Sequence, residues 1–503
     1  MTKTLLINPY LTVAGDDPAQ PSIMLSLPYL AAYLRKNGFP VKLLDVAGEG
    51  CENVIGVGAK KRYGLSDTDI LDAIKTEAPD VVGITAPSTS HITDVQDMAR
   101  FVKSVCPKAL VVVGGAHASS NFKEVLNDNN VDLVIIGEGE ETLLDLVRRV
   151  DGGASLEAIP GTAFRKDGAV HLAAPRPYIE NLDKLPFPAR DLLPIEALLQ
   201  RSGEGVNYAM RKRFVTMITS RGCPGSCIYC GVKSVWGHRW RGRSAANVVD
   251  EVEELMLKYG AGEIHFLDDS MSVSKTRLME ICDEIIRRKL DIKWTTPNGI
   301  AVWFMDKALL RKMKQAGCYR LTFGLESGNK ETLKFMGKHY DYGQAREMIR
   351  YAGEIGIWTI GTFIIGFPYE KRESIEDTIS FAIKSDLNFA VFYIANPLPG
   401  TKMYEYFDKE GLLPKDNKSI VRGVGSKYFS HEELVKIQSE AFTRFMRTRV
   451  SRPGLFLNKV RGFEDFKYLL KLGGQFSKML MNSRKIEKEG TAVLWKNSGP
   501  KKR

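Results

Sequence analysis

The segment Arg221-Gly-Cys-Pro-Gly-Ser-Cys-Ile-Tyr-Cys230 contains three cysteines, Cys223, Cys227 and Cys230, within one short run. The spacing C-x3-C-x2-C supplies three thiolates from a single tight loop, whereas a [4Fe–4S] cube has four irons to ligate. One iron would therefore remain open for a ligand that is not protein. The sequence predicts an iron–sulfur centre with one exchangeable coordination position.

Two other uses of these cysteines agree less well with the sequence. A zinc site would need a fourth ligand at regular spacing, and no second C-x2-C pair or H-x3-H pair is present. A disulfide framework fits poorly, because seven cysteines are an odd number and no secretory signal opens the chain. The remaining cysteines are far away in sequence and from one another: Cys51, Cys106, Cys282 and Cys318.

The cysteine run resembles the cluster motif of radical S-adenosylmethionine (SAM) enzymes, including the aromatic Tyr229 before the last cysteine. In that family the amino and carboxylate groups of SAM chelate the open iron. Reductive cleavage of SAM then gives a 5′-deoxyadenosyl radical, which abstracts hydrogen from unactivated carbon. The resemblance implies that Cys223, Cys227 and Cys230 hold a [4Fe–4S] cluster and that SAM is a cofactor.

The composition is that of an ordinary globular protein. The chain has 503 residues, of which 44% are hydrophobic and 26% are charged. At about 100–200 residues per domain, this length predicts two to four domains. No run of about 18 apolar residues is present, so we expect no segment to span a bilayer. We expect a cytoplasmic location, which an oxygen-labile cluster also requires.

The net charge of +11 is unevenly distributed along the chain. The segment from His431 to Arg503 has 17 Lys+Arg against 7 Asp+Glu, a surplus of 10. Nearly the whole excess therefore lies in one basic appendage, and the preceding body is close to neutral. This distribution argues against a protein that coats nucleic acid.

Residues 1–150 alternate short apolar runs with amphipathic segments of helical length. This alternation predicts an α/β fold with a parallel, doubly wound, Rossmann-like sheet. Ligands of such sheets bind beyond the carboxyl ends of the strands, so the loops after each run are the candidate sites. The predicted strands are Leu5–Ile7, Val41–Leu44, Val81–Ile84, Leu110–Val113 and Leu133–Ile136.

The loops after these strands resemble those of a cobalamin (B12) binding domain. The loop Pro87-Ser-Thr-Ser90 and the Gly-Gly pair after the fourth strand match the elements that line the buried nucleotide tail in such domains. Glycine lets a bulky ligand approach the backbone, and a hydroxyl can bond a benzimidazole nitrogen. A generic nucleotide-binding or structural α/β domain is the alternative. The candidate cobalamin residues are Tyr10, Ser88, Ser90, Gly114, Gly115, His117, Glu138 and Gly139.

One departure from the B12 pattern concerns the first loop. Many B12 proteins carry Asp-x-His-x-x-Gly there, with a histidine that ligates cobalt from below. Here the loop from Asn8 to Asp17 has no histidine. We therefore expect cobalamin to be held with its own base displaced and no histidine from this loop on the metal, with Tyr10 as the candidate neighbour of the lower face.

Residues 151–211 contain several prolines and are predicted to be a linker. The alternation of strands and helices resumes over residues 212–405. The resemblance implies the partial (β/α)6 TIM-like barrel of radical SAM enzymes. In such barrels the active site collects at the carboxyl ends of the strands. The predicted strands are Phe214–Thr219, Ile264–Asp269, Trp294–Gly299, Tyr319–Gly328, Gly361–Pro368 and Val391–Thr401.

The resemblance also implies site residues at these strand ends. Glu326 matches the carboxylate that bonds the ribose hydroxyls of SAM, and Gly366 and Pro368 match the strand end that frames its adenine. Asp269 follows a strand that ends in two carboxylates, and it is a candidate SAM contact. The radical steps need no acid–base residue, so the catalytic residues stay open. The candidates for testing are Tyr229, Asp269, Arg320 and Tyr393.

The last stretch, residues 406–503, predicts a basic helical extension. Glu433 to Val450 has the pattern of a helix, which Arg452-Pro453 ends. A second amphipathic segment follows, with an apolar stripe that would either close the open edge of the barrel or contact an anionic membrane, a protein or a polyanionic substrate. The stripe consists of Phe463, Phe466, Leu470, Phe476 and Leu480.

A radical SAM barrel preceded by a B12 domain resembles the class B radical SAM methyltransferases. The resemblance implies that methyl passes from SAM through methylcobalamin to an unactivated sp3 carbon, with a low-potential electron donor as partner. The substrate stays open between a small molecule, a lipid such as a hopanoid, and a peptide side chain such as glutamine in methyl-coenzyme M reductase. Alternatives are a non-methylating oxidative cyclase and a cobalamin or SAM sensor, which would not need an open iron.

Overall fold

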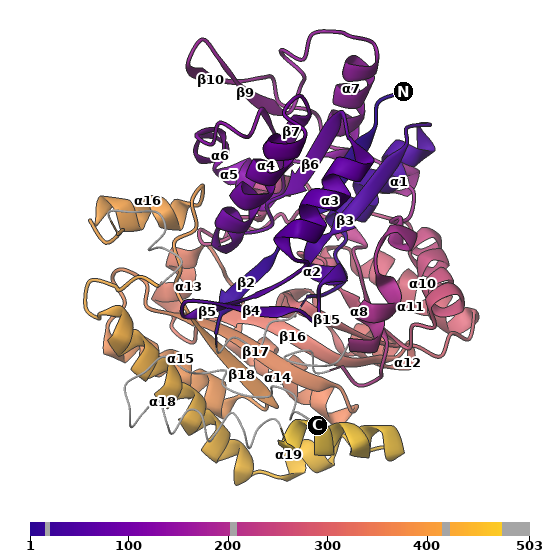
Figure 1. Cartoon of the computed structure of the whole chain (residues 1–503). Helices are drawn as coiled ribbons and strands as arrows, with labels where there is room; N and C mark the ends of the chain where they lie inside the picture. Colours follow the sequence, from indigo (N-terminus) through magenta and orange to yellow (C-terminus); the bar gives the residue numbers. More distant parts are fainter. Residues whose placement is uncertain (16–20, 202–208, 415–422, 475–503) are drawn as a thin grey trace. The chain divides into compact units, whose positions relative to one another are not determined.

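The computed structural model describes residues 1–15, 21–201, 209–414 and 423–474, and the chain divides into two compact units. The first unit comprises Met1–Ser202 and Gly231–Arg241, and the second comprises Gly203–Cys230 and Gly242–Arg503. The chain thus leaves the second unit directly after the last cysteine of the run. It returns to the second unit at Gly242. Figure 1 labels most of the helices and strands named below.

The first unit is built on a seven-stranded sheet with the strand order β10-β9-β8-β7-β6-β1-β3. The five strands predicted from the apolar runs are present and parallel, which confirms the doubly wound fold. The order reverses between β1 and β6, the switch point at which such sheets bind ligands. The strands are β1 (Thr4–Asn8), β3 (Val41–Asp45), β6 (Val81–Thr85), β7 (Leu110–Gly114), β8 (Leu133–Ile135), β9 (Thr162–Lys166) and β10 (Ala169–Leu172).

Helices cover both faces of this sheet. Leu5 and Ile7 belong to one hydrophobic core and Leu6 to the other, as the two-residue period of a strand requires. Residues of α3 and α4 complete the first core, and residues of α1 and α7 complete the second. The helices of this unit are α1 (Ser26–Lys36), α2 (Val46–Glu49), α3 (Asp67–Glu77), α4 (Ile92–Val105), α5 (Ala116–Ser120), α6 (Phe122–Leu126), α7 (Glu140–Asp151), α8 (Ile195–Arg201) and α9 (Val232–Trp236).

Part of the segment predicted as a linker extends the sheet. β9 pairs antiparallel with β8, and β10 pairs antiparallel with β9. The two strands join through Asp167 and Gly168, both with positive φ, which is the Asp-Gly signal of a two-residue hairpin. Every residue of β10 is at least partly exposed, so this edge hairpin has no continuous apolar run in the sequence.

A small three-stranded sheet, absent from the sequence-based prediction, lies beyond the end of β1. Its order is β2-β5-β4, with β2 at Leu11–Ala14, β4 at Val54–Val57 and β5 at Lys60–Tyr63. Both pairings are antiparallel, and β4 is exposed along its whole length. β5, Lys60-Lys-Arg-Tyr63, has no apolar run in the sequence, whereas β4, Val54-Ile-Gly-Val57, is apolar yet exposed.

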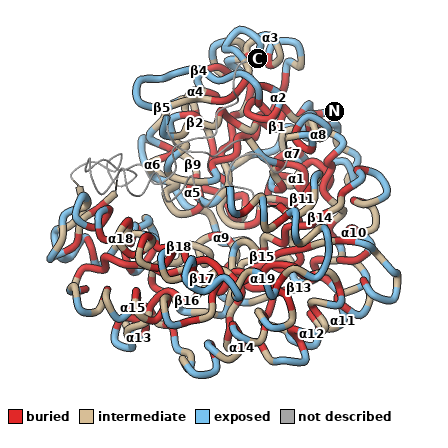
Figure 2. Tube along the Cα trace, turned by 90° about the horizontal axis from the view of Figure 1, so that it is seen from below, coloured by how far each residue is buried: buried red, intermediate tan, exposed pale blue. Residues whose placement is uncertain are grey.

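The second unit contains six parallel strands in chain order, β11-β14-β15-β16-β17-β18, which confirms the predicted partial barrel. All residues of β11 and β14 are buried, as the red segments of Figure 2 indicate. An order without reversal places successive crossover helices on one face of the sheet. The strands are β11 (Phe214–Met217), β14 (Glu263–Phe266), β15 (Lys293–Ile300), β16 (Cys318–Glu326), β17 (Trp358–Ile365) and β18 (Phe389–Ile394).

The helices of the second unit include the predicted helical extension. Helix α18 begins with a capping box, in which Ser430 and Glu433 each accept a hydrogen bond from the other's backbone N–H. The helices are α10 (Ala245–Tyr259), α11 (Lys275–Arg287), α12 (Lys307–Gln315), α13 (Lys330–Met336), α14 (Tyr342–Glu354), α15 (Arg372–Lys384), α16 (Lys402–Lys409), α18 (His431–Val450) and α19 (Gly454–Leu457).

The helical residues 463–474 pack at the amino ends of the barrel strands. Tyr468 and Leu472 are 2% exposed and share a hydrophobic cluster with Tyr319, Trp358 and Phe389. These three aromatic residues lie at or next to the first positions of β16, β17 and β18. The segment therefore covers the end of the strands opposite to their carboxyl ends.

This placement corrects the expectation that the apolar stripe closes the open, carboxyl edge of the barrel. Phe463, Phe466 and Leu470 are 71%, 46% and 60% exposed. The residues that are buried, Tyr468 and Leu472, lie four apart on another face of the same helix. The other two stripe positions, Phe476 and Leu480, lie outside the described residues.

Candidate functional site

The cysteine loop follows β11 at the carboxyl end of the barrel strands. Cys223, Cys227 and Cys230 are partly buried and free of disulfides. A Cβ added at Gly225 would lie 3.4 Å from Cys223 Sγ and 3.8 Å from Cys227 Sγ, so two sulfurs flank a glycine that leaves the space between them open. A set of three thiolates, two of them beside this open space, fits an iron–sulfur cube with one iron left open.

The described residues contain no group of three or more His, Cys, Asp or Glu side chains placed to hold a single metal ion. Each thiolate of a [4Fe–4S] cluster binds a different iron, so its ligands need not converge on one point. Within the described part of the chain, no helix is both long and apolar enough to cross a bilayer.

Two carboxylates after β14 support the base of the cysteine loop. Asp268 is buried and accepts hydrogen bonds from the backbone N–H of Thr219 (3.1 Å) and from its hydroxyl (2.7 Å), and also from the Ser220 hydroxyl. Asp269 accepts a hydrogen bond from the backbone of Gly222. Burial, and then the neighbouring Asp268 charge, raise the pKa of Asp269 to about 6. Both side chains therefore shape the loop that carries the thiolates.

Glu326 ends β16 in an unusual backbone conformation. Its φ of +64° lies in the left-handed region, which is rare for residues other than glycine. The pairing register with β17 slips by one residue between Gly324 and Glu326, as in a β-bulge, which re-aims a side chain. The sequence had placed Glu326 at a strand end, and the structure puts it at the carboxyl edge.

Lys338 pairs with Glu326 inside the protein. Its Nζ lies 2.9 Å from Glu326 Oε1, and the two side chains are 9% and 10% exposed. A Cβ at Gly324 would lie 2.9 Å from Glu326 Oε1 and 3.2 Å from Lys338 Nζ, so the pair occupies the space that this glycine leaves free. A side chain at position 324 would therefore displace the charged ends of both residues.

Aromatic residues hold this pair in place. Lys338 Nζ lies 5.3 Å from the centre of the Trp303 ring, which stacks on Tyr340 at 6.0 Å between ring centroids. The Tyr340 hydroxyl donates hydrogen bonds to the carbonyls of Leu325 (2.9 Å) and Ser327 (3.2 Å), on either side of Glu326. The backbone around Glu326 is thus fixed from both sides.

Tyr229 and Tyr393 lie close to Glu326. Burial, and then the Glu326 carboxylate, raise the pKa of Tyr229 well above its ordinary value, so it stays a neutral phenol. Its side chain also hydrogen-bonds with that of Cys227. Tyr393, on β18, is 52% exposed, yet desolvation and then Glu326 raise the pKa of its hydroxyl. The structure brings both candidates to the strand-end site.

Arg320 is not brought to this site. It is the third residue of β16, six positions before Glu326 and near the amino ends of the strands. Its buried guanidinium donates hydrogen bonds to the hydroxyls of Thr295 (3.2 Å) and Tyr468 (3.1 Å). Active sites of such barrels form at the opposite, carboxyl end. The contacts of Arg320 are those of a core residue, which differs from the catalytic candidacy expected from the sequence.

The loop after β17 is held by a residue that the sequence analysis did not single out. Glu370 is fully buried and accepts hydrogen bonds from the backbone N–H groups of Gly366 (2.7 Å) and Phe367 (3.2 Å). Burial raises the pKa of Glu370 to about 7. Gly366 has a φ of +89°, and Pro368 follows in the same turn. The turn predicted to frame adenine is therefore fixed by Glu370.

In the first unit, a pocket of about 180 Å³ opens at the switch point between β1 and β6. Asn8 and Tyr10 line it from the end of β1, and Thr85 and His91 line it from the end of β6. This is the position at which open α/β sheets bind ligands. The pocket is the candidate ligand site of the unit.

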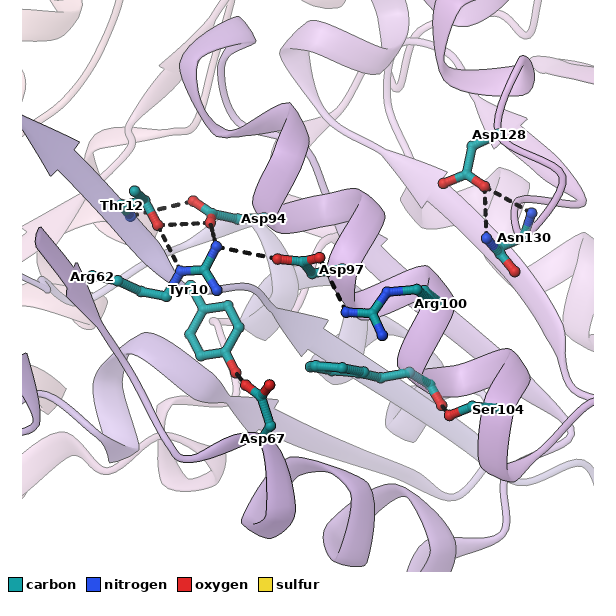
Figure 3. A network of polar contacts seen from close by, with 11 residues as sticks. Tyr10, Thr12, Arg62, Asp67, Asp94, Asp97, Arg100, Ser104, Asp128 and Asn130 are labelled. Carbon is teal, nitrogen blue, oxygen red and sulfur yellow. Dashed lines mark hydrogen bonds and ion pairs between the residues drawn. The ribbon is translucent and has the colours of Figure 1, made fainter. Parts of the chain in front are cut away.

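Tyr10 is fixed by a polar network (Figure 3). Its ring is buried, its hydroxyl donates a hydrogen bond to Asp67, and the Arg62 guanidinium lies 4.5 Å from the ring centre. Arg62 also pairs with Asp94 at 3.2 Å and with Asp97 at 3.1 Å. Tyr10 therefore presents a rigid wall to the pocket, with its hydroxyl already engaged by Asp67.

The loop after β6 brings the predicted serines together. Ser88 Oγ lies 2.7 Å from Ser90 Oγ and 2.9 Å from His91 Nδ1. His91 also lines the pocket at the switch point. The two hydroxyls thus lie in the same loop as a wall of this pocket.

The loop after β7 contains the Gly-Gly pair. Gly115 has a φ of +108°, and a Cβ there would lie 2.8 Å from the Ala86 carbonyl oxygen, so the close approach of two loops requires this glycine. A Cβ at Gly114 would meet its nearest neighbour only at 3.8 Å. Gly114 therefore leaves space in which a ligand could approach the backbone. Gly115 is instead explained by the packing of its own loop against Ala86.

His117, on α5, is buried and electrically neutral. Burial lowers the pKa of its imidazole to about 4. Its Nδ1 lies 3.1 Å from Thr89 Oγ1, while its buried Nε2 has no hydrogen-bond partner among the described residues. An unsatisfied buried imidazole nitrogen is costly unless a ligand completes it.

Glu138 and Gly139 contact protein groups, which differs from the cobalamin contacts expected of them. The Glu138 carboxylate accepts hydrogen bonds from Arg241 Nη1 (3.0 and 2.9 Å) and from the backbone N–H of Ile179 (2.7 Å). A Cβ at Gly139 would lie 3.0 Å from Leu30 Cδ2 on α1, so this glycine serves helix packing. The sequence could not reveal these partners, because they lie far away along the chain.

Comparisons with known proteins agree with this architecture. Residues 217–382 match the radical SAM superfamily, and residues 12–147 match the B12 binding domain. An uncharacterized methyltransferase of Pyrococcus horikoshii is 34% identical over 89% of this chain and 91% of its own. Cytidylyl-2-hydroxyethylphosphonate methyltransferase of Streptomyces wedmorensis is 33% identical over 82% of each chain. The anaerobic magnesium-protoporphyrin IX monomethyl ester cyclase of Rubrivivax gelatinosus is 28% identical over 80% of this chain and 69% of its own.

Two solved structures share the fold. The radical SAM methyltransferase TsrM from Kitasatospora setae superposes with a TM-score of 0.67 at 19% identity, over 82% of this chain and 76% of its own. The cobalamin-dependent SAM radical enzyme OxsB superposes with a TM-score of 0.71 at 18% identity, over 95% of this chain and 72% of its own.

The chain belongs to the radical SAM enzymes that carry a B12 binding domain, and its methyltransferase-like character within that family is confirmed. The cofactors expected from the sequence, a [4Fe–4S] cluster, SAM and cobalamin, are those of this family.

Proposed function

We propose that the protein is a C-methyltransferase that moves a methyl group from SAM, by way of cobalamin, to an unactivated sp3 carbon. The observation that carries the proposal is the pair of relatives above 30% identity. Both are named methyltransferases, and both cover more than four fifths of this chain. The cyclase relative, at 28% identity, supports oxidative cyclisation as the second candidate.

The residues of the barrel site suit this chemistry. When bound, the cluster and SAM supply a 5′-deoxyadenosyl radical, and cobalamin supplies the methyl group. Cys223, Cys227 and Cys230 would hold three irons and leave the fourth to SAM. Glu326 would accept hydrogen bonds from the ribose hydroxyls, with Lys338 fixing the direction of its carboxylate. Because the pair is preorganised, it costs no rearrangement when SAM binds.

Other residues would position the cluster loop and SAM. Asp268 and Asp269 hold the cysteine loop, and Glu370 holds the turn at Gly366 and Pro368 that would frame the adenine. Tyr229 presents a neutral hydroxyl beside Cys227 and would donate a hydrogen bond toward the cluster edge. Tyr229 and Tyr393 remain the candidates for contact with the reacting groups.

In the first unit, the pocket beside Tyr10 and His91 is the proposed entrance of the cobalamin site. The unpaired Nε2 of His117 would hydrogen-bond a polar group of the nucleotide tail, and Ser88 would contribute a hydroxyl. The described part of the loop after β1 contains no histidine, so we propose that cobalamin binds with its own base displaced. An absorption spectrum with a histidine on the cobalt would contradict this part of the proposal.

We propose three chemical classes of substrate. A peptide side chain, such as glutamine in methyl-coenzyme M reductase, is the candidate from the family. A nucleotide-linked phosphonate is the candidate from the Streptomyces relative. A hopanoid-type lipid is the third. We propose that the enzyme works in the cytoplasm with a low-potential electron donor.

The deciding experiment uses anaerobically reconstituted protein, cobalamin, a chemical reductant and SAM with a deuterated methyl group. Each candidate substrate is tested separately, and products are examined by mass spectrometry. A product that carries one labelled methyl group supports methylation. A dehydrogenated product without label supports cyclisation instead. The Cys227→Ala variant is the control, because it lacks one cluster ligand but keeps the B12 binding unit.

A further inference from the structure

The segment that follows the last cysteine is packed on the B12 binding unit. Residues 231–241 belong to the first unit, although Cys230 before them and Gly242 after them belong to the second. No residue separates Cys230 from this segment. Whatever holds residues 231–241 therefore also holds one end of the loop that carries the thiolates.

A buried ion pair fastens this segment. Arg241 and Glu138 have side chains that are 3% and 5% exposed. Arg241 Nη1 donates to both oxygens of Glu138, at 3.0 and 2.9 Å, and to the Ile179 carbonyl at 2.8 Å. Its guanidinium also lies 4.9 Å from the ring centre of Tyr178. Three hydrogen bonds from one guanidinium nitrogen, in a buried environment, restrict the position of the Arg241 side chain.

The rest of the segment contacts the helix that carries a cobalamin candidate. Helices α9 and α5 pack together, and Ser234 Oγ lies 3.2 Å from Ser120 Oγ. Helix α5 also contains His117, whose Nε2 is buried and unpaired among the described residues. A Cβ at Gly237 would lie 2.7 Å from the Tyr178 ring, so the turn after α9 fits tightly against it. Residues 231–241, which follow Cys230 directly in the chain, thus pack on the helix that contains His117.

We propose that Glu138 and Arg241 are positioning residues that anchor the carboxyl end of the cluster loop to the B12 binding unit. The anchoring lets the substrate radical, once formed, collect the methyl group before it is quenched. This inference rests on the proposed methyl transfer. It predicts that weakening the pair uncouples the two halves of the reaction: SAM is still cleaved, but fewer cleavage events end in a methylated product.

The test compares Arg241→Lys and the double variant Glu138→Gln/Arg241→Met with the wild type. The double variant keeps similar volumes and leaves no unpaired buried charge, so it guards against loss of folding. Arg239→Ala is the matched control. Arg239 lies on the same segment and pairs with Glu180 at 2.7 Å, but the two side chains are 72% and 58% exposed. An exposed pair of this kind contributes little.

Two measurements are made on each protein. The first is the ratio of methylated product to 5′-deoxyadenosine in reconstituted enzyme with matched iron and cobalamin content. We expect the ratio to fall about fivefold or more in both Arg241 variants and to stay unchanged in Arg239→Ala. The second is amide hydrogen exchange of peptide 231–241 in cofactor-free protein. We expect exchange about tenfold faster in the Arg241 variants only.

An unchanged ratio in the Arg241 variants, or an unchanged exchange rate, would overturn the positioning role. A parallel loss of deoxyadenosine and methylated product, at a constant ratio, would also overturn it, because that pattern indicates a purely structural pair. If the wild type itself forms deoxyadenosine but no methylated product, the proposed function fails. The hydrogen-exchange comparison then decides alone whether the pair anchors the loop.

Discussion

Lys338 Nζ lies 2.9 Å from Glu326 Oε1, and neither side chain is more than 10% exposed. Such a pair is strongly coupled, because removing one partner leaves the other charge buried without compensation. In Lys338→Met we expect SAM affinity to fall about tenfold or more, since the Glu326 carboxylate loses the charge that orients it. Equilibrium dialysis of labelled SAM against reconstituted protein measures this. Lys334→Met, at an exposed position nearby on α13, should bind SAM like the wild type.

Gly324 lies next to the charged ends of Glu326 and Lys338. In Gly324→Ala the new methyl group would lie 2.9 Å from Glu326 Oε1 and 3.2 Å from Lys338 Nζ. We expect a loss of about 1–3 kcal/mol in the free energy of unfolding, with weaker SAM binding. Urea unfolding of the cofactor-free protein checks the first effect. Gly454→Ala, where nothing lies within 4 Å of the added Cβ, is the control and should change little. Equal stability of the two variants would contradict this account.

The cysteine assignment predicts a sharp difference between cysteines. In Cys227→Ala we expect no stable [4Fe–4S] cluster after reconstitution and no deoxyadenosine, because a cluster ligand is missing. Cys106→Ala lies far from the loop in sequence and should keep both. Iron and sulfide content and chromatography of deoxyadenosine provide the measurements. Deoxyadenosine formation by Cys227→Ala at the wild-type rate would refute the assignment.

The raised pKa of Glu370 predicts that the free energy of unfolding depends on pH. Its pKa of about 7 exceeds the ordinary 4.5, so the folded protein binds this proton more tightly than the unfolded chain. The tighter proton binding by Glu370 adds about 3 kcal/mol to the free energy of unfolding below pH 4.5. This contribution is lost as the pH rises from 4.5 to 7. Glu370→Gln cannot titrate, so relative to the wild type it should gain stability over that range. Unfolding of both cofactor-free proteins at pH 5 and pH 8 tests this, and a constant difference would exclude it.

The buried contacts of Tyr468 predict that the helical residues 463–474 stabilise the barrel and do not close its active site. Its ring contacts Tyr319 and Trp358, each edge to face at 5.4 Å between centroids. Tyr468→Ala should cost about 3–5 kcal/mol in unfolding free energy. Leu470→Ala, on the same helix but 60% exposed, should cost almost nothing. Thermal unfolding measures both. A selective loss of turnover in Tyr468→Ala without destabilisation would instead support a lid.

Much of the fold could be predicted because buried parallel strands leave continuous apolar runs, as at Val81–Thr85 and Leu110–Gly114. Two exposed strands were missed: β10 contains the polar His171, and β4, Val54-Ile-Gly-Val57, is apolar but lies outside the main sheet. The helix at residues 463–474 shows a related difficulty. Its stripe of large apolar residues suggested a buried face, yet the buried contacts come from Tyr468 and Leu472.

The sequence by itself predicted the cluster ligands, since three thiolates within one loop need no distant partner, and it gave the order of the B12 binding and radical SAM domains. It also placed Glu326 and Asp269 at strand ends, because parallel strands meet at a common edge. Only the tertiary structure decided that Lys338 faces Glu326, that Glu138 holds Arg241, and that Arg320 lies at the other end of its strand from Glu326. Paired charges depend on distances between side chains that are brought together only when the sheet and its helices pack, and no local pattern records those distances.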